Sequence, residues 1–156
     1  MKRIHIASVL LLALFLAACS ESGEVSDFTF STNHTANGLS IICDDDSTNL
    51  RYSFTYTPNL LGELRSWDQE LVGEDTGEVR FTRRFFPSDD QVTFEDTTYT
   101  VNTVIPSRTA PLTVDGQAII VEPIVKGQSR LVVEVNGTLN DTQIFRSRAI
   151  DVVDCF

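Results

Sequence analysis

Apolar and polar side chains alternate with a period of two along much of the chain. The clearest case is residues 50–57, in which one face of the extended chain is apolar: Leu50, Tyr52, Phe54 and Tyr56. A period of two is typical of a β-strand that buries one face and exposes the other. The same alternation recurs in residues 99–103 and 131–135, so we predict strands in all three segments.

Polar turns separate the predicted strands. Residues 95–97 are polar and follow the short run 92–94, which predicts a hairpin into the next strand. Another polar turn, residues 33–38, separates the strand candidates 28–30 and 39–43. Three dipeptides are typical of further reversals: Lys126-Gly127 and the two-residue hairpin turns Asp115-Gly116 and Asn136-Gly137.

One segment departs from the period of two. Within residues 59–71, the apolar residues are spaced by four, three and four positions: Leu60, Leu64, Trp67 and Leu71. This spacing places them on one face of a helix, and Asn59 is a suitable N-cap residue. We therefore predict one short helix near residues 59–71 that lies across one end of the sheets, although Gly62 weakens it.

About nine short strands with frequent turns predict an antiparallel β-sandwich of immunoglobulin-like kind. We expect residues 27–156 to form this sandwich as a single domain, since the sequence contains no internal repeat and no low-complexity linker. The cysteine–tryptophan–cysteine signature of immunoglobulin domains is absent, because Trp67 lies in the predicted helix and Cys155 almost at the end of the chain. The fold class is predicted as all-β.

The first residues have the features of a targeting segment. Lys2 and Arg3 give a positive start, and residues 4–16 are apolar except for His5 and Ser8. This run has the length of a signal-peptide core and is shorter than the roughly 20 residues of a membrane-spanning helix. Residues 1–18 are therefore predicted to be a signal peptide.

The apolar run ends at Leu16-Ala17-Ala18-Cys19, which closely resembles the lipobox of bacterial lipoproteins. By that resemblance, the chain is cut before Cys19, whose sulfur and new amino group are acylated, and residues 19–26 become a lipidated tether. Several acyl chains on one residue suit stable anchoring. Ser20 stands where an aspartate would resemble the inner-membrane retention signal, which implies the outer membrane. The alternative is an ordinary signal peptide with an incidental cysteine.

Charge limits the partners of the processed chain. Without residues 1–18 it has 22 acidic and 10 basic side chains, which is a formal charge of −12. Such a chain is repelled by the phosphates of nucleic acid, so we expect no nucleic-acid partner. A chain of about 138 residues buries enough surface to fold without a metal, and no cofactor is predicted.

Two cysteines remain after processing, Cys43 and Cys155. Export places them in an oxidising compartment, where a pair of cysteines is expected to form a disulfide. Both share strand parity with apolar neighbours, so we predict that their sulfur atoms point into the core. The bond would close a loop of about 113 residues and stabilise the fold by roughly 4–5 kcal/mol in the chain-entropy model. Two buried free thiols are the alternative.

Candidate catalytic and metal-binding residues are few. His34, the one histidine beyond the signal peptide, lies in a polar turn, so we expect a solvated side chain rather than a ligand or a base. The run Asp44-Asp45-Asp46 offers oxygen ligands for calcium, but it lacks the EF-hand glycine and glutamate, and a solvated turn also accounts for it. We predict no metal site. The sequence contains no phosphate-binding loop, dinucleotide fingerprint or serine-nucleophile motif.

Two further groups of side chains have both a structural and a functional interpretation. The aromatic row in residues 52–56 could stack against sugars, but its strand spacing is more typical of a core. Two arginine pairs each share one strand face: Arg80 with Arg84, and Arg146 with Arg148. These pairs could bind an anion, or they could keep strand edges from pairing with other chains.

Together these features predict a lipid-anchored protein of the cell envelope, in the outer membrane, that acts as a binding or structural module and not as an enzyme. Its partners would be the membrane, through Cys19, and an envelope or surface protein. The alternative hypothesis is an envelope hydrolase, which would require Asp or Glu carboxylates that converge in a cleft. The sequence alone does not select those carboxylates.

Overall fold

The computed structural model describes residues 23–58, 62–108, 125–138 and 142–155. The regular structure in these ranges consists of twelve strands: β1 (Glu24–Thr32), β2 (Thr35–Ala36), β3 (Leu39–Ser40), β4 (Ile42–Cys43), β5 (Thr48–Thr57), β6 (Leu64–Gly73), β7 (Val79–Phe85), β8 (Val92–Glu95), β9 (Thr98–Ile105), β10 (Val125–Gly137), β11 (Thr142–Arg146) and β12 (Ile150–Val153). Within the same ranges, no helix has the length and apolar character needed to cross a membrane.

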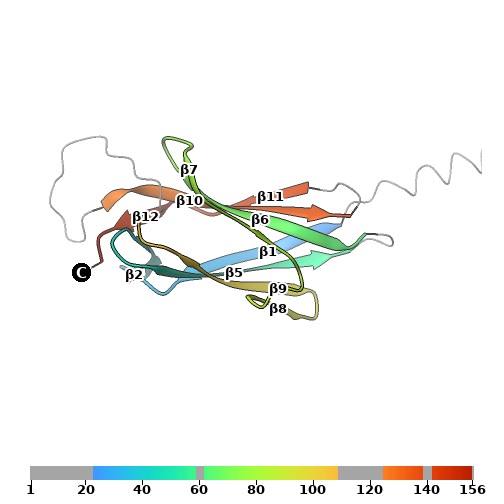
Figure 1. The fold of residues 1–156 in the computed structure, drawn as a ribbon. Coiled ribbons are helices and arrows are strands. Elements are labelled where there is room, and N and C mark those ends of the chain that lie inside the picture. Colours follow the sequence, from blue (N-terminus) through green and yellow to red (C-terminus); the bar gives the residue numbers. More distant parts are fainter. Residues whose placement is uncertain (1–22, 59–61, 109–124, 139–141, 156) are drawn as a thin grey trace, which may run out of the picture.

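The strands form two large sheets that pack against each other (Figure 1). One sheet has the order β1-β5-β9-β8, and the other has the order β4-β12-β10-β6-β7, with β11 also pairing with β10. The hairpin β2-β3 forms a small separate sheet. Strand pairing is antiparallel except between β12 and β4, which are parallel. The predicted all-β sandwich is confirmed, and its immunoglobulin-like character stays a prediction.

The inner faces of the two sheets form one hydrophobic core. β5 contributes the alternating residues predicted from the sequence, each at most 5 % exposed: Leu50, Tyr52, Phe54 and Tyr56. β10 contributes its own predicted row, which is also buried: Leu131, Val133 and Val135. Trp67 of β6 is fully buried, and its Nε1 donates a hydrogen bond to the Tyr52 hydroxyl at 2.8 Å. The aromatic row of β5 is therefore core and not an exposed platform for sugars.

The helix predicted near residues 59–71 is wrong where the structure describes the chain, because Leu64–Gly73 is strand β6. Residues 59–61 lie outside the described residues. The error has two causes. The pairing with β10 shifts register between Leu64 and Ser66, which buries both Leu64 and Trp67 three positions apart. Gln69 is also fully buried on the inner face, two positions after Trp67. A polar residue at an inner position interrupts the period of two and leaves the apolar residues at helical spacing. Pairing with β10 on one edge and β7 on the other fixes this segment as a strand.

The predicted turns have different outcomes. The hairpin at residues 95–97 is confirmed by the pairing of β8 with β9. Lys126-Gly127 is wrong as a reversal, because it lies inside β10. Asn136-Gly137 ends β10 just before the chain returns as the antiparallel β11, so a reversal follows it, but the pairing of Asn136 with Thr142 excludes a two-residue turn. Between Val125 and Gly127 the pairing with β12 shifts register, so Lys126 marks a bulge in the strand and not its end. Asp115-Gly116 lies outside the described residues.

β1 begins at Glu24, inside the segment 19–26 that was predicted to be a tether. The pairing of β1 with β5 shifts register at Asp27, which has a φ of 54°. A bulge changes which face the following residues occupy, and Val25 and Phe28 both pack in the core although three positions separate them. This change of parity hid the first residues of the strand from the sequence pattern.

Residues 39–43, predicted as one strand, form the two short strands β3 and β4 on either side of Ile41. Asn37 and Gly38, with φ values of 52° and 76°, make the tight turn between β2 and β3. Positive φ at both central residues is the signature of a two-residue hairpin turn, and Asn-Gly is its preferred sequence. Beyond this hairpin, β4 enters the larger sheet beside β12.

Candidate functional site

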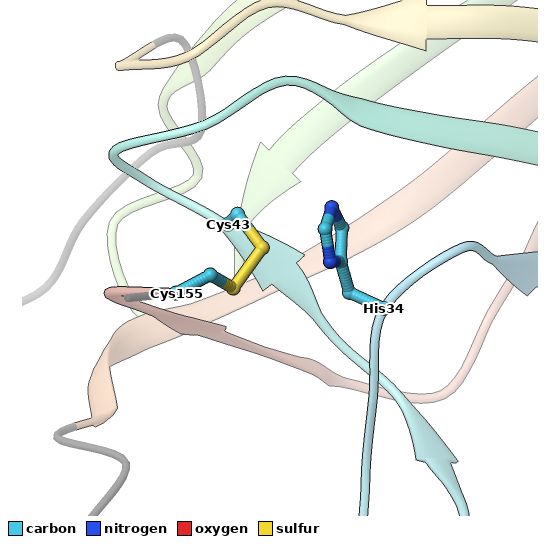
Figure 2. A group of neighbouring side chains, drawn as sticks. All are labelled: His34, Cys43 and Cys155. Carbon is cyan, nitrogen blue, oxygen red and sulfur yellow. A yellow bond between two sulfur atoms is a disulfide. The ribbon is translucent and has the colours of Figure 1, made fainter.

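The predicted disulfide is present at one end of the sandwich (Figure 2). The sulfur atoms of Cys43 and Cys155 are 1.95 Å apart, and the two Cα atoms are 5.4 Å apart. Cys43 is the last residue of β4, and Cys155 follows β12, the parallel neighbour of β4. Cys43 is buried and Cys155 is half-buried. The bond therefore joins an early part of the fold to its last strand, as predicted.

His34 stands beside this disulfide, and a ring nitrogen and both sulfur atoms lie within 4.8 Å of one another (Figure 2). The imidazole Nε2 is 3.0 Å from Asn33 Nδ2 and 3.2 Å from the carbonyl oxygen of Ser47. His34 lies between β1 and β2, is half-buried and makes these contacts on the exposed side of the turn, which agrees with the predicted loop position. Thiolates are the form of cysteine that binds metals, and both sulfur atoms are joined to each other. The three side chains therefore do not offer a metal site in the oxidised chain.

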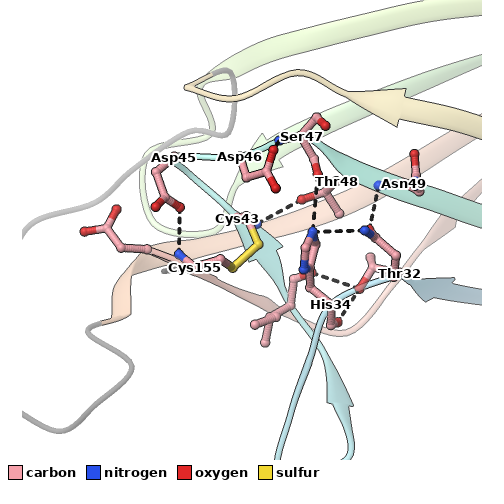
Figure 3. Close-up of a disulfide and its surroundings, with 12 residues drawn as sticks. Thr32, His34, Cys43, Asp45, Asp46, Ser47, Thr48, Asn49 and Cys155 are labelled. Atoms are coloured by element: carbon pink, nitrogen blue, oxygen red, sulfur yellow. Dashed lines mark hydrogen bonds between the residues drawn. A yellow bond between two sulfur atoms is a disulfide. The ribbon is translucent and has the colours of Figure 1, made fainter.

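The acidic run next to the disulfide has structural partners (Figure 3). Asp44 Oδ2 lies 3.0 Å from the Nζ atom of Lys126. Asp45 accepts a hydrogen bond from the backbone N–H of Cys155 at 2.6 Å, and Asp46 accepts one from the next residue in the chain. Calcium ligands converge on one point, whereas these three consecutive carboxylates each bind a different group. The arrangement supports the interpretation as a structural turn.

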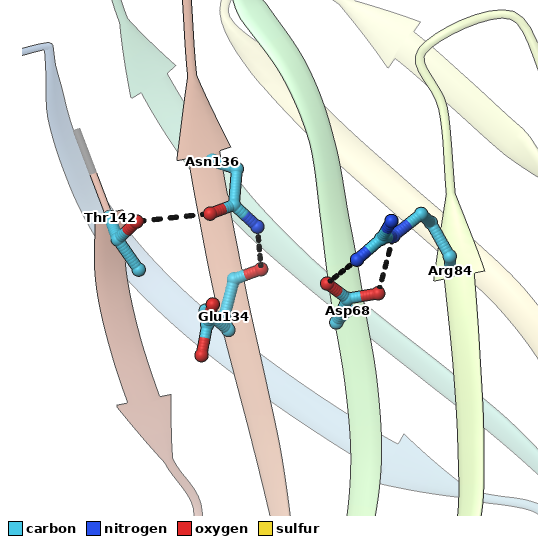
Figure 4. A network of polar contacts seen from close by, with 5 residues as sticks. All are labelled: Asp68, Arg84, Glu134, Asn136 and Thr142. Atoms are coloured by element: carbon cyan, nitrogen blue, oxygen red, sulfur yellow. Dashed lines mark hydrogen bonds and ion pairs between the residues drawn. The ribbon is translucent and has the colours of Figure 1, made fainter. Parts of the chain in front are cut away.

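The outer face of the larger sheet carries an ion pair and a small hollow (Figure 4). Arg84 donates two hydrogen bonds to the carboxylate of Asp68, at 2.8 and 2.7 Å. These bonds raise the pKa of Arg84 above its ordinary value. Glu134 lies beside Asp68 on the neighbouring strand, and both border a hollow of ≈ 300 Å³. Because Arg84 binds both oxygens of Asp68, this carboxylate pair lacks the two free carboxyl groups that a glycosidase-type mechanism uses.

The two arginine pairs predicted from the sequence have different outcomes. Arg84 binds Asp68, while the side chain of Arg80 lies outside the described part of the chain. Arg146 and Arg148 are both exposed, so the anion-binding interpretation of that pair stays a prediction.

Arg83, which the sequence analysis did not single out, points inward from the edge strand β7 and discourages pairing of this strand with another chain. Arg83 of the edge strand β7 donates hydrogen bonds to Thr103 at 3.2 Å and to Gln91. Its guanidinium carbon lies 5.0 Å from the centre of the Phe85 ring. Inward-pointing charges on an edge strand discourage pairing with another chain.

The outer face of the four-stranded sheet has a different chemistry, and we call it the hydroxyl face. Its outward side chains come from all four strands and are mostly hydroxyls and amides, with Glu95 and the exposed Val104 among them: Thr29, Ser31, Asn49, Arg51, Ser53, Thr55, Thr93, Glu95, Thr98, Thr100, Asn102 and Val104. Strand pairing places them in rows, one of which joins Ser31, Arg51 and Asn102 across β1, β5 and β9. Hydroxyls in neighbouring strands contact each other, as Thr29 Oγ1 and Ser53 Oγ do at 2.8 Å.

Arg51 occupies a central position on the hydroxyl face, on the inner strand β5. Its side chain is exposed and has no ion pair or side-chain hydrogen bond within the part of the chain that the structure describes. This differs from Arg84 and Arg130, each of which binds a carboxylate. The guanidinium of Arg51 therefore keeps its N–H donors available for water or a ligand.

Two shallow hollows on the hydroxyl face meet at Arg51. The first measures ≈ 430 Å³ and is otherwise bordered by uncharged residues, among them Asn102. The second measures ≈ 480 Å³ and adds Phe94, Glu95 and Asp96 to its border. Volumes of this size fall in the range of small-molecule sites. Arg51 and the two hollows are the candidate functional site.

Sequence reasoning assigned Arg51 to the outward face of its strand without singling it out. Its row neighbours Ser31 and Asn102 come from other strands, and a strand pattern does not reveal which strands pair. The available signal was the repetition of Ser, Thr and Asn at outward positions of residues 51–57 and 98–103.

No protein-family model matches the chain, and no curated protein matches it. Among solved structures, the chain is similar to a DUF4466 family protein from Parabacteroides merdae ATCC 43184, with 14% sequence identity and a TM-score of 0.36. The match covers 83% of this chain and 46% of that protein, so the chain spans about half the length of this structural neighbour. Similarity at this level assigns no family.

Proposed function

We propose that this chain is a lipid-anchored protein of the cell envelope, in the outer membrane, whose sandwich binds a partner through the hydroxyl face. The lipobox-like residues 16–19 support the anchoring at Cys19. The disulfide between Cys43 and Cys155 is consistent with the oxidising compartment that an exported chain would reach. The protein acts by binding and not by catalysis.

The observation that carries the binding function is the exposed, unpaired guanidinium of Arg51 where two hollows meet. Among the arginines whose side chains the structure describes, Arg84 and Arg130 bind a carboxylate, whereas Arg51 is unpaired and borders two hollows. An arginine set among hydroxyls and amides instead keeps its charge-assisted hydrogen bonds for a group from outside the chain.

The other polar clusters support structure more than binding. Asp68 and Arg84 satisfy each other, and Lys126 binds Asp44 at the disulfide end. A group that is already paired gains less from a ligand, because the internal partner must first be released. The hydroxyl face is therefore the part of the described surface that best fits a binding function.

Site-specific photo-crosslinking in living cells tests this proposal. A photo-crosslinking amino acid replaces Ser53 on the hydroxyl face of the full chain, and Glu70 on the outer face of the other sheet is the matched control. Both positions are half-buried and lie on inner strands of their sheets. We expect a discrete crosslinked product from Ser53 that disappears when Arg51→Gln is added, and no such product from Glu70. Equal products at both positions, or none at Ser53, would contradict the proposed function.

A further inference from the structure

Hydroxyl and amide side chains determine what the hydroxyl face can recognise. Each Ser or Thr hydroxyl both donates and accepts hydrogen bonds, and each Asn offers donors and an acceptor. Sugars present hydroxyl groups of the same dual character along their ring edges. Protein partners are bound mainly through a desolvated centre with aromatic anchors, whereas the centre of this face, around Arg51, is polar. The face therefore suits a glycan better than a protein.

Arg51 adds a preference for a carboxylate. A planar guanidinium binds a planar carboxylate through two parallel N–H···O bonds. Ser31 and Asn102 flank Arg51 in the same row and can bind the hydroxyls that adjoin the carboxylate. Dense polyanions require many cations and are repelled by a formal charge of −12 in the chain without residues 1–18. A sparsely charged ligand fits a single arginine.

The two hollows differ in charge, and this difference orients the ligand. The first contains Arg51 as its charged residue, so a carboxylate is favoured there. The second adds Glu95 and Asp96, which accept hydrogen bonds from neutral sugar hydroxyls and repel a second carboxylate. Phe94 also borders the second hollow, but its ring packs against Tyr99 at a centroid distance of 4.6 Å, on the core side of the sheet. The groups that the second hollow offers to a neutral sugar are therefore the hydroxyls of Thr93, Thr98 and Thr100.

We propose that the hydroxyl face binds a glycan in which carboxylate-bearing sugars alternate with neutral ones. One carboxylate binds Arg51 over the first hollow, and the adjoining neutral sugar lies over the second hollow against the hydroxyls of Thr93, Thr98 and Thr100. The proposal rests on the proposed function and names the ligand class for the same face.

Calorimetric titration of the detergent-solubilised full chain at low ionic strength tests the ligand class. The probes are hexasaccharides of hyaluronan and of unsulfated chondroitin, in which glucuronate alternates with a neutral amino sugar. We expect at least one of them to bind, and Arg51→Gln to weaken that binding about tenfold or more, which corresponds to the loss of a charge-assisted hydrogen bond. Arg65→Gln, at an exposed position in β6 of the other sheet, is the matched control and should leave binding unchanged.

Two further hexasaccharides separate charge from sugar recognition. Neutral chitohexaose should bind the unmodified chain about tenfold more weakly than the glucuronate probe and should not respond to Arg51→Gln. Failure of both glucuronate probes to bind, equal binding by Arg51→Gln, or tighter binding of a heparin hexasaccharide would overturn the proposal. A crosslink from Ser53 in cells without glycan binding would leave the binding function standing with another ligand class. Absence of both the Ser53 crosslink and glycan binding would contradict the proposed function as well.

Discussion

The side chain of Gln69 is fully buried, and neither its Oε1 nor its Nε2 atom has a hydrogen-bond partner among the described residues. In the larger sheet it lies beside Val133 on one neighbouring strand and Arg83 on the other. A buried amide without partners destabilises a fold by roughly 1–3 kcal/mol. Gln69 is therefore a position at which a substitution should raise stability.

We expect Gln69→Met to raise the free energy of unfolding by about 1–2 kcal/mol, because methionine keeps the unbranched shape and removes the unsatisfied amide. Urea denaturation at pH 7 measures the change. Gln128→Met, at an exposed position of β10, is the control and should not raise stability. A loss of stability in Gln69→Met would show that the amide has a partner in solution and would refute the argument.

Tyr52 and Trp67 make a polar contact inside the core that is satisfied, with the indole as donor. Burial raises the pKa of Tyr52 far above its ordinary value, and the hydrogen bond from Trp67 only partly opposes this. The ordinary pKa of a tyrosine is about 10. Below that pH both the folded and the unfolded chain keep the proton. Above it the unfolded chain alone releases the proton, so the stability linked to Tyr52 falls as the pH rises.

Tyr52→Phe should therefore have two effects. At pH 7 we expect the free energy of unfolding to fall by about 1–3 kcal/mol, because the Trp67 indole N–H loses its acceptor in the core. Above about pH 10 we expect its stability to fall less steeply with pH than that of the unmodified chain. Urea unfolding curves from pH 7 to 11 measure both effects, and parallel declines in the two proteins would count against this assignment of Tyr52.

The elements that follow the period of two were predictable, and the exceptions have identifiable causes. From Leu50 in β5 and from Leu131 in β10, apolar residues alternate without a break on the inner face, and this pattern requires a strand. β6 was misread because its pairing with β10 shifts register between Leu64 and Ser66 and because Gln69 is polar at an inner position. The start of β1 was missed because the register shift at Asp27 changes the parity, and the bulge at Lys126 resembles a turn because Gly follows it.

The candidate site was predictable only at the level of single strands. The outward position of Arg51 follows from the alternation in β5, and the disulfide was predicted from the expected export and the count of cysteines. The hydroxyl face follows only from the pairing of β5 with β1 and β9, which brings Ser31 and Asn102 to Arg51. Pairing partners depend on the packing of the whole sandwich, which no single segment contains.

The disulfide reinforces the weakest attachment of the larger sheet. β4 pairs with β12 through Ile42 and Cys43 alone. We expect the double variant Cys43→Ala, Cys155→Ala to lower the free energy of unfolding by roughly 4–5 kcal/mol, as the chain-entropy model gives for a loop of about 113 residues. Urea denaturation measures this loss, and the unmodified chain with its disulfide reduced should match the double variant. An unchanged urea midpoint in both would show that the bond does not stabilise the fold.

Anchoring at Cys19 concerns the molecule as a whole, because it sets where the sandwich resides. If Cys19 carries several acyl chains, Cys19→Ser should leave the membrane fraction or remain unprocessed, since the chain then has no lipid to hold it. Membrane fractionation and intact-mass measurement check the prediction, with Ser20→Ala as the control. Retention in the membrane with an unchanged mature mass would exclude lipidation at this residue.

The early start of β1 has a geometric consequence for such an anchored molecule. Residues 20–23 span at most roughly 14 Å between Cys19 and the strand, so the end of the sandwich where β1 starts would rest against the bilayer. β12 and the end of the chain marked C, next to which the disulfide forms, lie at the opposite end (Figure 1). Ten residues of β5 correspond to a height of about 33 Å. The strands of the hydroxyl face would then run roughly along the membrane normal. Its second hollow would lie near the lipid and its first hollow farther from it. A polymer held across both hollows would run outward along the membrane normal, away from the cell boundary that anchors the protein.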